Sequence, residues 1–196
     1  MSKRNFSEIY REFYPKIRYY LTRLVGDHEA EDVAQIVFEK VNNNLATFKG
    51  ESRISTWIFK IATNAALDRL KSPNYKRTSS GPQAPVPLQS VENIEMAFNK
   101  PTAPDQKVIR EEMSDCIREF VDRLPPDYRT IIVLNELEGF TNKEVAEILQ
   151  ISLDAAKIRL HRARTNLKKS LESGCDFYLN EGSELACDRK QPVDQD

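Results

Sequence analysis

The sequence has little glycine, no long apolar segment and none of the motifs that usually mark an enzyme. Only 6 of its 196 residues are glycine, and long alternating runs of β-branched residues are absent, so we expect an all-α fold. No apolar run approaches the length needed to cross a bilayer, and no membrane insertion is expected. There is no glycine-rich phosphate loop, no His/Cys cluster at metal-ligand spacing and no Ser/His/Asp arrangement. We therefore expect no catalytic residue, no metal and no cofactor.

The net charge of −1 conceals two segments of opposite sign. Residues 151–173 carry six Lys or Arg against two acids, whereas residues 175–196 carry six acids against two bases. Charged residues interrupt the N-terminal segment every few positions, which excludes a signal-peptide core there. A cytoplasmic protein is therefore expected, and its three cysteines should be reduced.

Helical spacing of apolar residues predicts three helices in a first module, residues 1–72. Pro15 interrupts the first helix, and an interior proline costs a helix about 3 kcal/mol, so a kink or break is expected near Tyr14. Gly26 should end this helix and start the next. Ser55 is the expected N-cap of the third helix, which should bury Trp57.

Residues 73–104 contain six of the ten prolines and show no sustained period, which predicts a flexible linker. A second module, residues 105–173, opens with a helix that stops before Pro125. Pro126 can start the next helix, and Gly139 should end it. The expected architecture is two small helical domains joined by this linker, with an acidic, cysteine-containing tail at 174–196.

The second module ends in two helices joined by a tight turn. Thr141 and Glu144 form a T-x-x-E capping box that signals the first of them. Ser152 is the N-cap candidate of the second, and Asp154 lies in its first turn, where the helix dipole favours an anion. One face of this second helix is an apolar packing stripe of Ala156, Leu160, Ala163, Leu167 and Leu171.

A different face of the same helix is basic and carries Lys157, His161, Arg164 and Lys168, with Arg159 and Arg162 nearby. A short helix, a turn and a basic second helix can place side chains against major-groove base edges and phosphates. We interpret residues 141–171 as a DNA-binding helix-turn-helix. A solvated basic helix in a bundle is the structural alternative.

Two further surfaces lie in the first module. The third helix aligns Lys60 and Asn64 on one face, close to the loop around Phe48, and such a mixture suits capture of an unstacked base. Pattern alone favours Trp57 as a core residue rather than a stacking platform. The second helix carries a polar stripe that includes Asp32 and Gln35; such stripes are usually only solvated, and a partner-binding role is the alternative.

Four motifs occur together, in a fixed order. From Glu31 the chain reads E-D-x-x-Q-x-x-F, and from Phe48 it reads F-x-G-x-S-x-x-x-T-W-x-x-x-I-A-x-N. From Leu124 it reads L-P-P-x-Y-R, and from Lys157 it reads K-x-R-L-H-R-A-R. With these motifs the chain resembles the sigma-70 family of bacterial RNA polymerase sigma factors, in particular the compact extracytoplasmic-function (ECF) type. The similarity covers most of residues 6–171 and is poor in the linker and tail.

The resemblance implies a sigma factor that binds core RNA polymerase and directs initiation at promoters by recognising −10 and −35 elements. Residues at polymerase-docking positions of the family are Asp32, Gln35, Phe38 and Glu39. Those at −10 positions are Phe48, Lys49, Ser52, Arg53, Lys60 and Asn64. Those at −35 positions are Ser152, Asp154, Lys157, Ile158, Arg159, His161, Arg162 and Arg164.

The family also implies promoter DNA and core RNA polymerase as partners, an anti-sigma factor as a further candidate partner, and a monomer when free. Four residues depart from its common pattern. Asp154-Ala155 stands where the family often has Gly-Thr, Ile158 where it often has Ser, and Ile54 where an aromatic is frequent. The promoter sequences read are therefore expected to differ from common ones. A stand-alone helix-turn-helix regulator is the alternative function, and polymerase binding distinguishes the two.

The tail contains Cys175 and Cys187, separated by eleven residues. Two thiolates are half of a zinc site, and neither histidine is near in sequence. A redox or metal switch is one interpretation. The other is a tail that packs Phe177, Tyr178 and Leu179 against the second module. Because the tail is acidic, a third hypothesis is that it shields the basic helix until polymerase binds.

Overall fold

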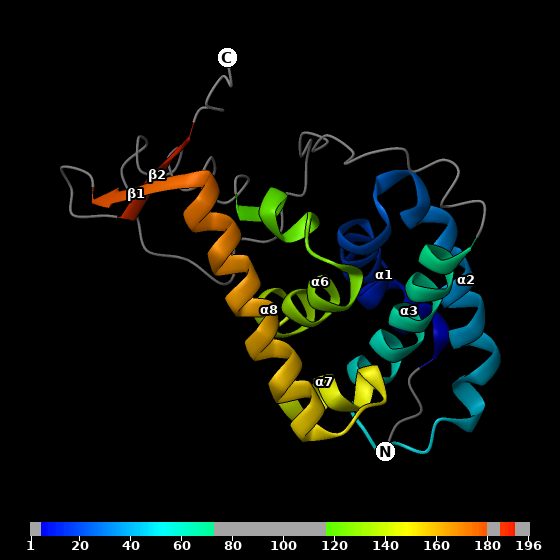
Figure 1. Ribbon diagram of the computed structural model, residues 1–196. Helices are drawn as coiled ribbons and strands as arrows, with labels where there is room; N and C mark the ends of the chain where they lie inside the picture. The colour runs from blue at the N-terminus through cyan, green and yellow to red at the C-terminus, as the bar shows by residue number, and fades with distance from the viewer. Residues whose placement is uncertain (1–4, 73–116, 180–184, 191–196) are drawn as a thin grey trace. The chain divides into compact units, whose positions relative to one another are not determined.

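The computed structural model describes residues 5–72, 117–179 and 185–190. These residues fall into two compact units. The first unit contains α1 (Phe6–Val25), α2 (Asp27–Asn44), the short 3-10 helix η1 (Leu45–Thr47) and α3 (Ile54–Lys71), followed by residues 125–163 (Figure 1). The described residues of the second unit are 117–124, 164–179 and 185–190. The predicted linker and the first part of the predicted helix after it, Cys116 included, lie outside the described residues.

Helices α1, α2 and α3 pack together around one apolar core. Each presents a stripe of fully buried side chains, among them Ile17, Val37 and Ala62. The hydroxyls of Tyr20 and Thr63 lie 2.7 Å apart inside this core, so the polar group of the buried tyrosine has a partner. Gly26, with φ of 85°, ends α1 and precedes α2, as the sequence predicts.

The sequence predicts a kink or a break near Tyr14, and the break does not occur, because Pro15 lies inside one continuous helix. Helix α1 runs without interruption from Phe6 to Val25. Phe13 and Ile17, on either side of the proline, are both buried. Packing of this continuous apolar face outweighs the hydrogen bond that a proline removes, because most helical stability in proteins comes from tertiary contacts.

Helix α3 begins two residues earlier than predicted and buries a different aromatic. Ile54 is its first residue, and Arg53 occupies the N-cap position without a side-chain hydrogen bond, so Ser55 is not the cap. Trp57 is only half-buried, whereas Phe59 is buried and contacts Tyr20 with ring centroids 5.0 Å apart. The prediction that Trp57 belongs to the core is wrong; Phe59 has that place.

The segment after Pro125 forms α6 (Pro126–Ile132), η2 (Val133–Leu137), α7 (Asn142–Leu149) and the start of α8 (Leu153–Gly174). Pro126 opens α6 as predicted. The single predicted helix to Leu137 instead widens into a π-helix at η2, where the Glu138 amide donates to the Val133 carbonyl at 2.9 Å. Gly139, with φ of 71°, follows this helix and leads to α7.

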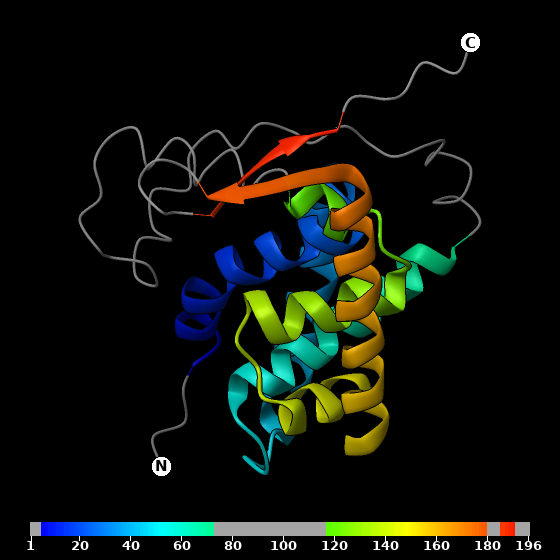
Figure 2. The ribbon, with the colours of Figure 1, turned by 60° about the vertical axis from the view of Figure 1, so that its left-hand side comes forward.

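The second unit contains the C-terminal half of α8 and a two-stranded antiparallel sheet. Strands β1 (Cys175–Leu179) and β2 (Leu185–Arg189) form a hairpin, and Figure 2 shows β1 leaving the end of α8 with β2 beside it. The predicted helical class is confirmed, and the hairpin is an unpredicted addition to it. The side chains of Phe177, Tyr178 and Leu179 are exposed, so the prediction that they pack against the second module is wrong.

Candidate nucleic-acid interface

Helices α7 and α8 form a helix-turn-helix with local hydrogen bonds at each boundary. Thr141 and Glu144 make the predicted capping box, and the Thr141 hydroxyl donates to the Glu144 carboxylate at 2.7 Å. This hydrogen bond is the main reason why the pKa of Glu144 is lowered. Gln150 closes α7 in the left-handed conformation, with φ of 55°. The Ser152 hydroxyl then accepts from the Ala155 amide at 3.1 Å, which confirms the predicted cap of α8.

Helix α8 buries one face and exposes the other. Ala156, Leu160 and Ala163 are buried as predicted, whereas the later members of the apolar stripe, Leu167 and Leu171, are only partly buried. The side chains predicted to read the −35 element are exposed except Arg159, which is half-buried: Ser152, Asp154, Lys157, Ile158, His161, Arg162 and Arg164. Their exposure leaves base edges and phosphates accessible to them.

Two exposed residues on this face have unusual chemistry for a DNA-contacting helix. Ile158 is 53% exposed and can offer only apolar contact, for instance to a thymine methyl group. The Asp154 carboxylate lies 3.9 Å from the Lys157 ammonium, so its charge is partly compensated. A carboxylate at a DNA-contacting position would repel phosphates but could accept a hydrogen bond from a cytosine amine.

The second predicted surface is built by the loop before α3 and by the first turns of that helix. The rings of Phe48 and Trp57 lie 5.0 Å apart at an interplanar angle of 37°, and both are half-buried. Lys49, Arg53 and Asn64 are exposed, and Ser52 and Lys60 are half-buried. An aromatic pair flanked by cations and amides can stack an unpaired base while holding the adjacent backbone. Trp57 was not among the predicted contact residues, because the sequence does not show that its ring lies beside that of Phe48.

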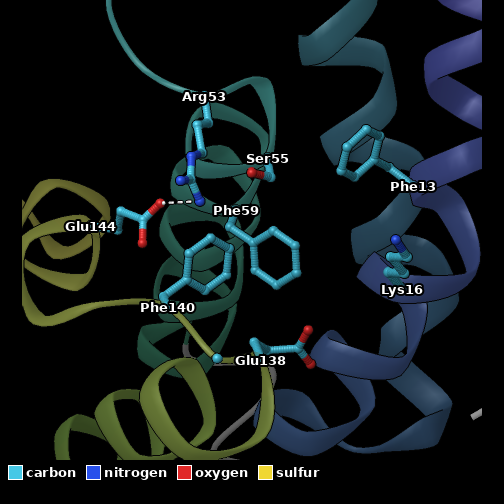
Figure 3. Close-up of a pocket in the computed structure, with 9 residues that line it drawn as sticks. Phe13, Lys16, Arg53, Ser55, Phe59, Glu138, Phe140 and Glu144 are labelled. Carbon is cyan, nitrogen blue, oxygen red and sulfur yellow. Dashed lines mark ion pairs between the residues drawn. The ribbon is translucent and has the colours of Figure 1, made fainter. Parts of the chain in front are cut away.

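Arg53 links this loop to the helix-turn-helix within the first unit. Its guanidinium lies 3.2 Å from the Glu144 carboxylate, although the arginine side chain is 79% exposed. The arginine end of this ion pair is exposed while the Glu144 side chain is 17% exposed, so a phosphate can approach the guanidinium from the solvent side. Glu144 therefore has two partners, the cap of its own helix and Arg53 (Figure 3).

A cavity of about 220 Å³ lies beside this ion pair. In Figure 3 the rings of Phe59 and Phe140 lie edge to face, with centroids 4.8 Å apart and an interplanar angle of 64°, and Lys16 and Glu138 lie nearby. Burial raises the pKa of the Glu138 carboxyl to about 7, and the positive charge of Lys16 opposes that rise. The cavity thus contains a carboxyl that changes charge near neutral pH.

The polar face of α2 is a third candidate surface. Asp32, Gln35 and Glu39 are exposed, and Ile36 lies among them with 47% of its surface exposed. Sequence reasoning omitted Ile36, although its position four residues after Asp32 places it on the same helix face. A single exposed isoleucine is common on protein surfaces, but here it lies on the same helix face as the predicted polar stripe and could form the apolar part of a contact there.

Phe38 has to be removed from the predicted docking residues. Its side chain is 3% exposed and packs edge-on against Tyr10, with ring centroids 4.9 Å apart. Its ring also lies beside that of Tyr14, with ring centroids 5.7 Å apart. A partner cannot reach a side chain buried in this way, and its role is to hold α2 against α1.

Two features are absent from the described residues. Among them, no three His, Cys, Asp or Glu side chains gather as metal ligands would. No helix in the described ranges combines the length and apolarity needed to span a bilayer.

Comparison with known proteins identifies the family. The model for sigma-70 region 2 matches residues 9–74, and the model for sigma-70 region 4 matches residues 114–167. The chain is 33% identical over 173 residues to the ECF RNA polymerase sigma factor SigW of Bacillus subtilis, covering 85% of this chain and 88% of that protein. It is 31% identical over 173 residues to the RNA polymerase sigma-H factor of Pseudomonas aeruginosa, covering 87% and 88%.

Solved structures show the same fold. The sigma factor RpoE, in a co-crystal structure with the anti-sigma factor NepR from Bartonella quintana, matches with a TM-score of 0.60 and 22% identity, over 85% of this chain and 96% of that one. CnrH, in complex with the cytosolic domain of CnrY, matches with a TM-score of 0.57 and 20% identity, over 86% and 88%. With both sigma regions matched in order, the chain belongs to the sigma-70 family of RNA polymerase sigma factors and is of the ECF type.

Proposed function

We propose that this sigma factor binds core RNA polymerase through α2 and directs it to promoters through two separate DNA-contact surfaces. Sigma factors are non-enzymatic initiation factors, so the chemistry of transcription belongs to the polymerase. The observation that carries the proposal is the exposed basic face of α8 on a capped helix-turn-helix. It supports sequence reading by side chains in the major groove.

In the −35 interaction, α8 enters the major groove. Lys157, His161 and Arg162 contact base edges together with Ile158, and Arg159 and Arg164 contact phosphates or neighbouring helices. Each good bidentate contact to a base discriminates by about 1–3 kcal/mol, whereas phosphate contacts set register without reading sequence.

In the −10 interaction, the loop before α3 holds an unpaired base of the melted strand. Phe48 and Trp57 provide the aromatic surface, and base–aromatic stacking contributes about 1–3 kcal/mol per base. Lys49, Arg53 and Lys60 hold the backbone, and Ser52 and Asn64 offer hydrogen bonds. The aromatic contact and the exposure of the cations support this assignment.

The polymerase contact is made by Asp32, Gln35 and Glu39, with Ile36 as its apolar centre. The exposed isoleucine supports the proposal, because interfaces concentrate binding energy in a few large side chains surrounded by a polar rim. The polymerase-binding and −10 domain is then residues 1–72, and the −35 domain is residues 105–173. The segment 73–104 tethers the two domains, and residues 174–196 form an appended tail. Two-point attachment through a tether strengthens promoter binding beyond either contact alone.

The protein acts in the cytoplasm, as a monomer when free, with core RNA polymerase and promoter DNA as partners. The RpoE and CnrH structures are complexes with other chains, NepR and CnrY, and the anti-sigma role of NepR supports a similar inhibitory partner for this chain. The alternative of a stand-alone regulator is set aside, because sigma-70 region 2 is matched over residues 9–74.

Run-off transcription tests the proposal directly. Bacterial core polymerase is supplied with a fragmented genomic library, with and without the protein, and start sites are mapped. New start sites that share two spaced upstream elements are expected. Duplex binding without any new start site would instead support the regulator.

A further inference from the structure

The C-terminal hairpin lies beyond the segment matched by the sigma-70 region 4 model, which ends at residue 167. In its register Cys175 pairs with Arg189, and Cys187 pairs with Phe177. Because side chains alternate between faces along a strand, positions 175, 177, 187 and 189 share one face. The two cysteines are therefore diagonal neighbours on that face, and both are thiols.

The two thiols differ in solvent exposure, and the more exposed one offers a metal ion a route to the buried one. Cys175 is 2% exposed, while Cys187 is half-buried. Soft metal ions bind thiolates, and burial excludes water and competing ligands from one side of such a site. An ion can reach the partly exposed sulfur first and then the buried one.

The diagonal spacing favours a bridging ion over a disulfide. Diagonal residues in an antiparallel pair have Cα atoms about 7–8 Å apart, whereas disulfides usually join Cα atoms about 4.4–6.8 Å apart. An ion placed between the sulfurs adds two metal–sulfur bonds in place of one sulfur–sulfur bond and so spans a longer distance than a disulfide.

The number of ligands decides which ion fits. Asp176 and Asp188 pair with each other and so lie on the opposite face of the hairpin. Among the described residues, no third His, Cys, Asp or Glu joins the two thiols, whereas structural zinc takes four ligands. We propose that Cys175 and Cys187 form a two-thiolate site for a soft monovalent metal ion, Cu(I).

Binding is a proton exchange without a redox step. The two thiols release two protons as one Cu(I) ion forms two copper–sulfur bonds, which leaves a bis-thiolate complex with a charge of −1. Arg189 lies directly opposite Cys175 in the strand register, and its guanidinium is paired with Glu119. Deprotonation of the ligands makes the affinity increase with pH.

Contacts at the base of the hairpin hold the two strands in this register. The Lys190 amide donates to the Gly174 carbonyl at 3.0 Å, and the Lys190 ammonium donates to the Glu172 carbonyl at 2.8 Å. Arg189 forms an ion pair with Glu119. A Cβ atom at Gly174 would lie 2.5 Å from the Phe120 ring, so only glycine allows this close approach. The site is thus largely preformed, which lowers the ordering cost of binding.

The test uses the full chain, reduced and without oxygen, in competition with the Cu(I) chelator bathocuproine disulfonate. The wild type should remove one Cu(I) per chain from the chelator and develop the ultraviolet absorption of copper–thiolate bonds. Cys187→Ser, at a half-buried position, and Cys175→Ser should each lose this ion. Cys116→Ser, which removes the remaining cysteine, should retain it.

A matched variant keeps the number of thiols and changes only the face. Cys187→Ser combined with Asp188→Cys moves the second thiol by one residue, to the opposite face, and should lose the ion while the far-ultraviolet circular dichroism stays unchanged. Retention of the ion by this variant or by Cys187→Ser would overturn the proposal. So would a wild type that fails to compete for Cu(I) and instead loses two hydrogens by mass spectrometry when treated with oxidised glutathione.

Discussion

Replacing Glu138 with glutamine should remove a pH dependence of stability that the cavity imposes on the first unit. The pKa of this carboxyl is raised from 4.5 to about 7 because it is buried. Between these values the folded chain holds the proton while the unfolded chain releases it. Stability therefore decreases as the pH rises from 4.5 and levels off above about 7.

The size of the effect follows from the shift. The pKa of Glu138 rises from 4.5 to about 7, and each pKa unit corresponds to about 1.4 kcal/mol. The free energy of unfolding therefore changes by about 3 kcal/mol across this pH range. Glutamine has nearly the same shape as the protonated acid and carries no charge. Glu138→Gln should therefore match the wild type near pH 4.5 and exceed its free energy of unfolding by up to about 3 kcal/mol above pH 8.

Urea unfolding at a series of pH values between about 4.5 and 8.5 measures this difference. Other ionisable groups alter both proteins equally, so the difference between the two curves isolates Glu138. Glu147→Gln, at an exposed position of α7, is the matched control for loss of a negative charge. Parallel curves for the wild type and Glu138→Gln would refute the reasoning and mean that the carboxyl is hydrated in solution.

Three further predictions concern the proposed interfaces. Arg162→Ala should weaken binding to the −35 element by about 1–3 kcal/mol in a duplex-binding assay, and unchanged promoter selectivity would contradict a base contact. Asp32→Ala combined with Gln35→Ala should weaken binding to core polymerase in a pull-down and leave duplex binding intact, whereas loss of both would indicate misfolding. Deletion of residues 175–196 should increase duplex binding by the free protein in a gel-shift assay if the acidic tail shields α8; equal binding would remove that hypothesis.

Features fixed by neighbouring residues were predictable from the sequence. The capping box at Thr141, the cap at Ser152, the boundary at Gly26 and the start of α6 at Pro126 all agree with the structure. Each depends on hydrogen bonding or backbone geometry within about one helical turn, so distant residues cannot easily override it.

Features that depend on tertiary contacts were not predictable. The choice of Phe59 over Trp57 as the core aromatic follows from the positions of Tyr20 and Phe140, which are far away in sequence. Continuity of α1 through Pro15 likewise reflects packing on α2 and α3. The site residues show the same division, since the exposed face of α8 followed from helical periodicity but the burial of Phe38 needed its contacts with α1.

The hairpin was missed for a different reason. Its strands are five residues long, and short segments of that length rarely show a clear period against their surroundings. A two-stranded hairpin is marginal by itself. Its contacts with Glu119 and with the end of α8 supply what the local sequence does not.

The π-helix η2 makes the cavity beside α7 depend on the number of residues in the chain as well as on their identity. A π-helical turn accommodates one more residue than an α-helical turn, and each residue of an α-helix advances the chain by about 100° around its axis. If residues 133–137 all continued α6 as a regular α-helix, Glu138 would turn away from Lys16 by about that angle. Phe140, two residues later, would lose its contact with Phe59 by the same rotation. Deleting one residue from 133–137 would remove the need for the wide turn, so α6 could continue as a regular helix while Glu138 and Phe140 keep their helical phase.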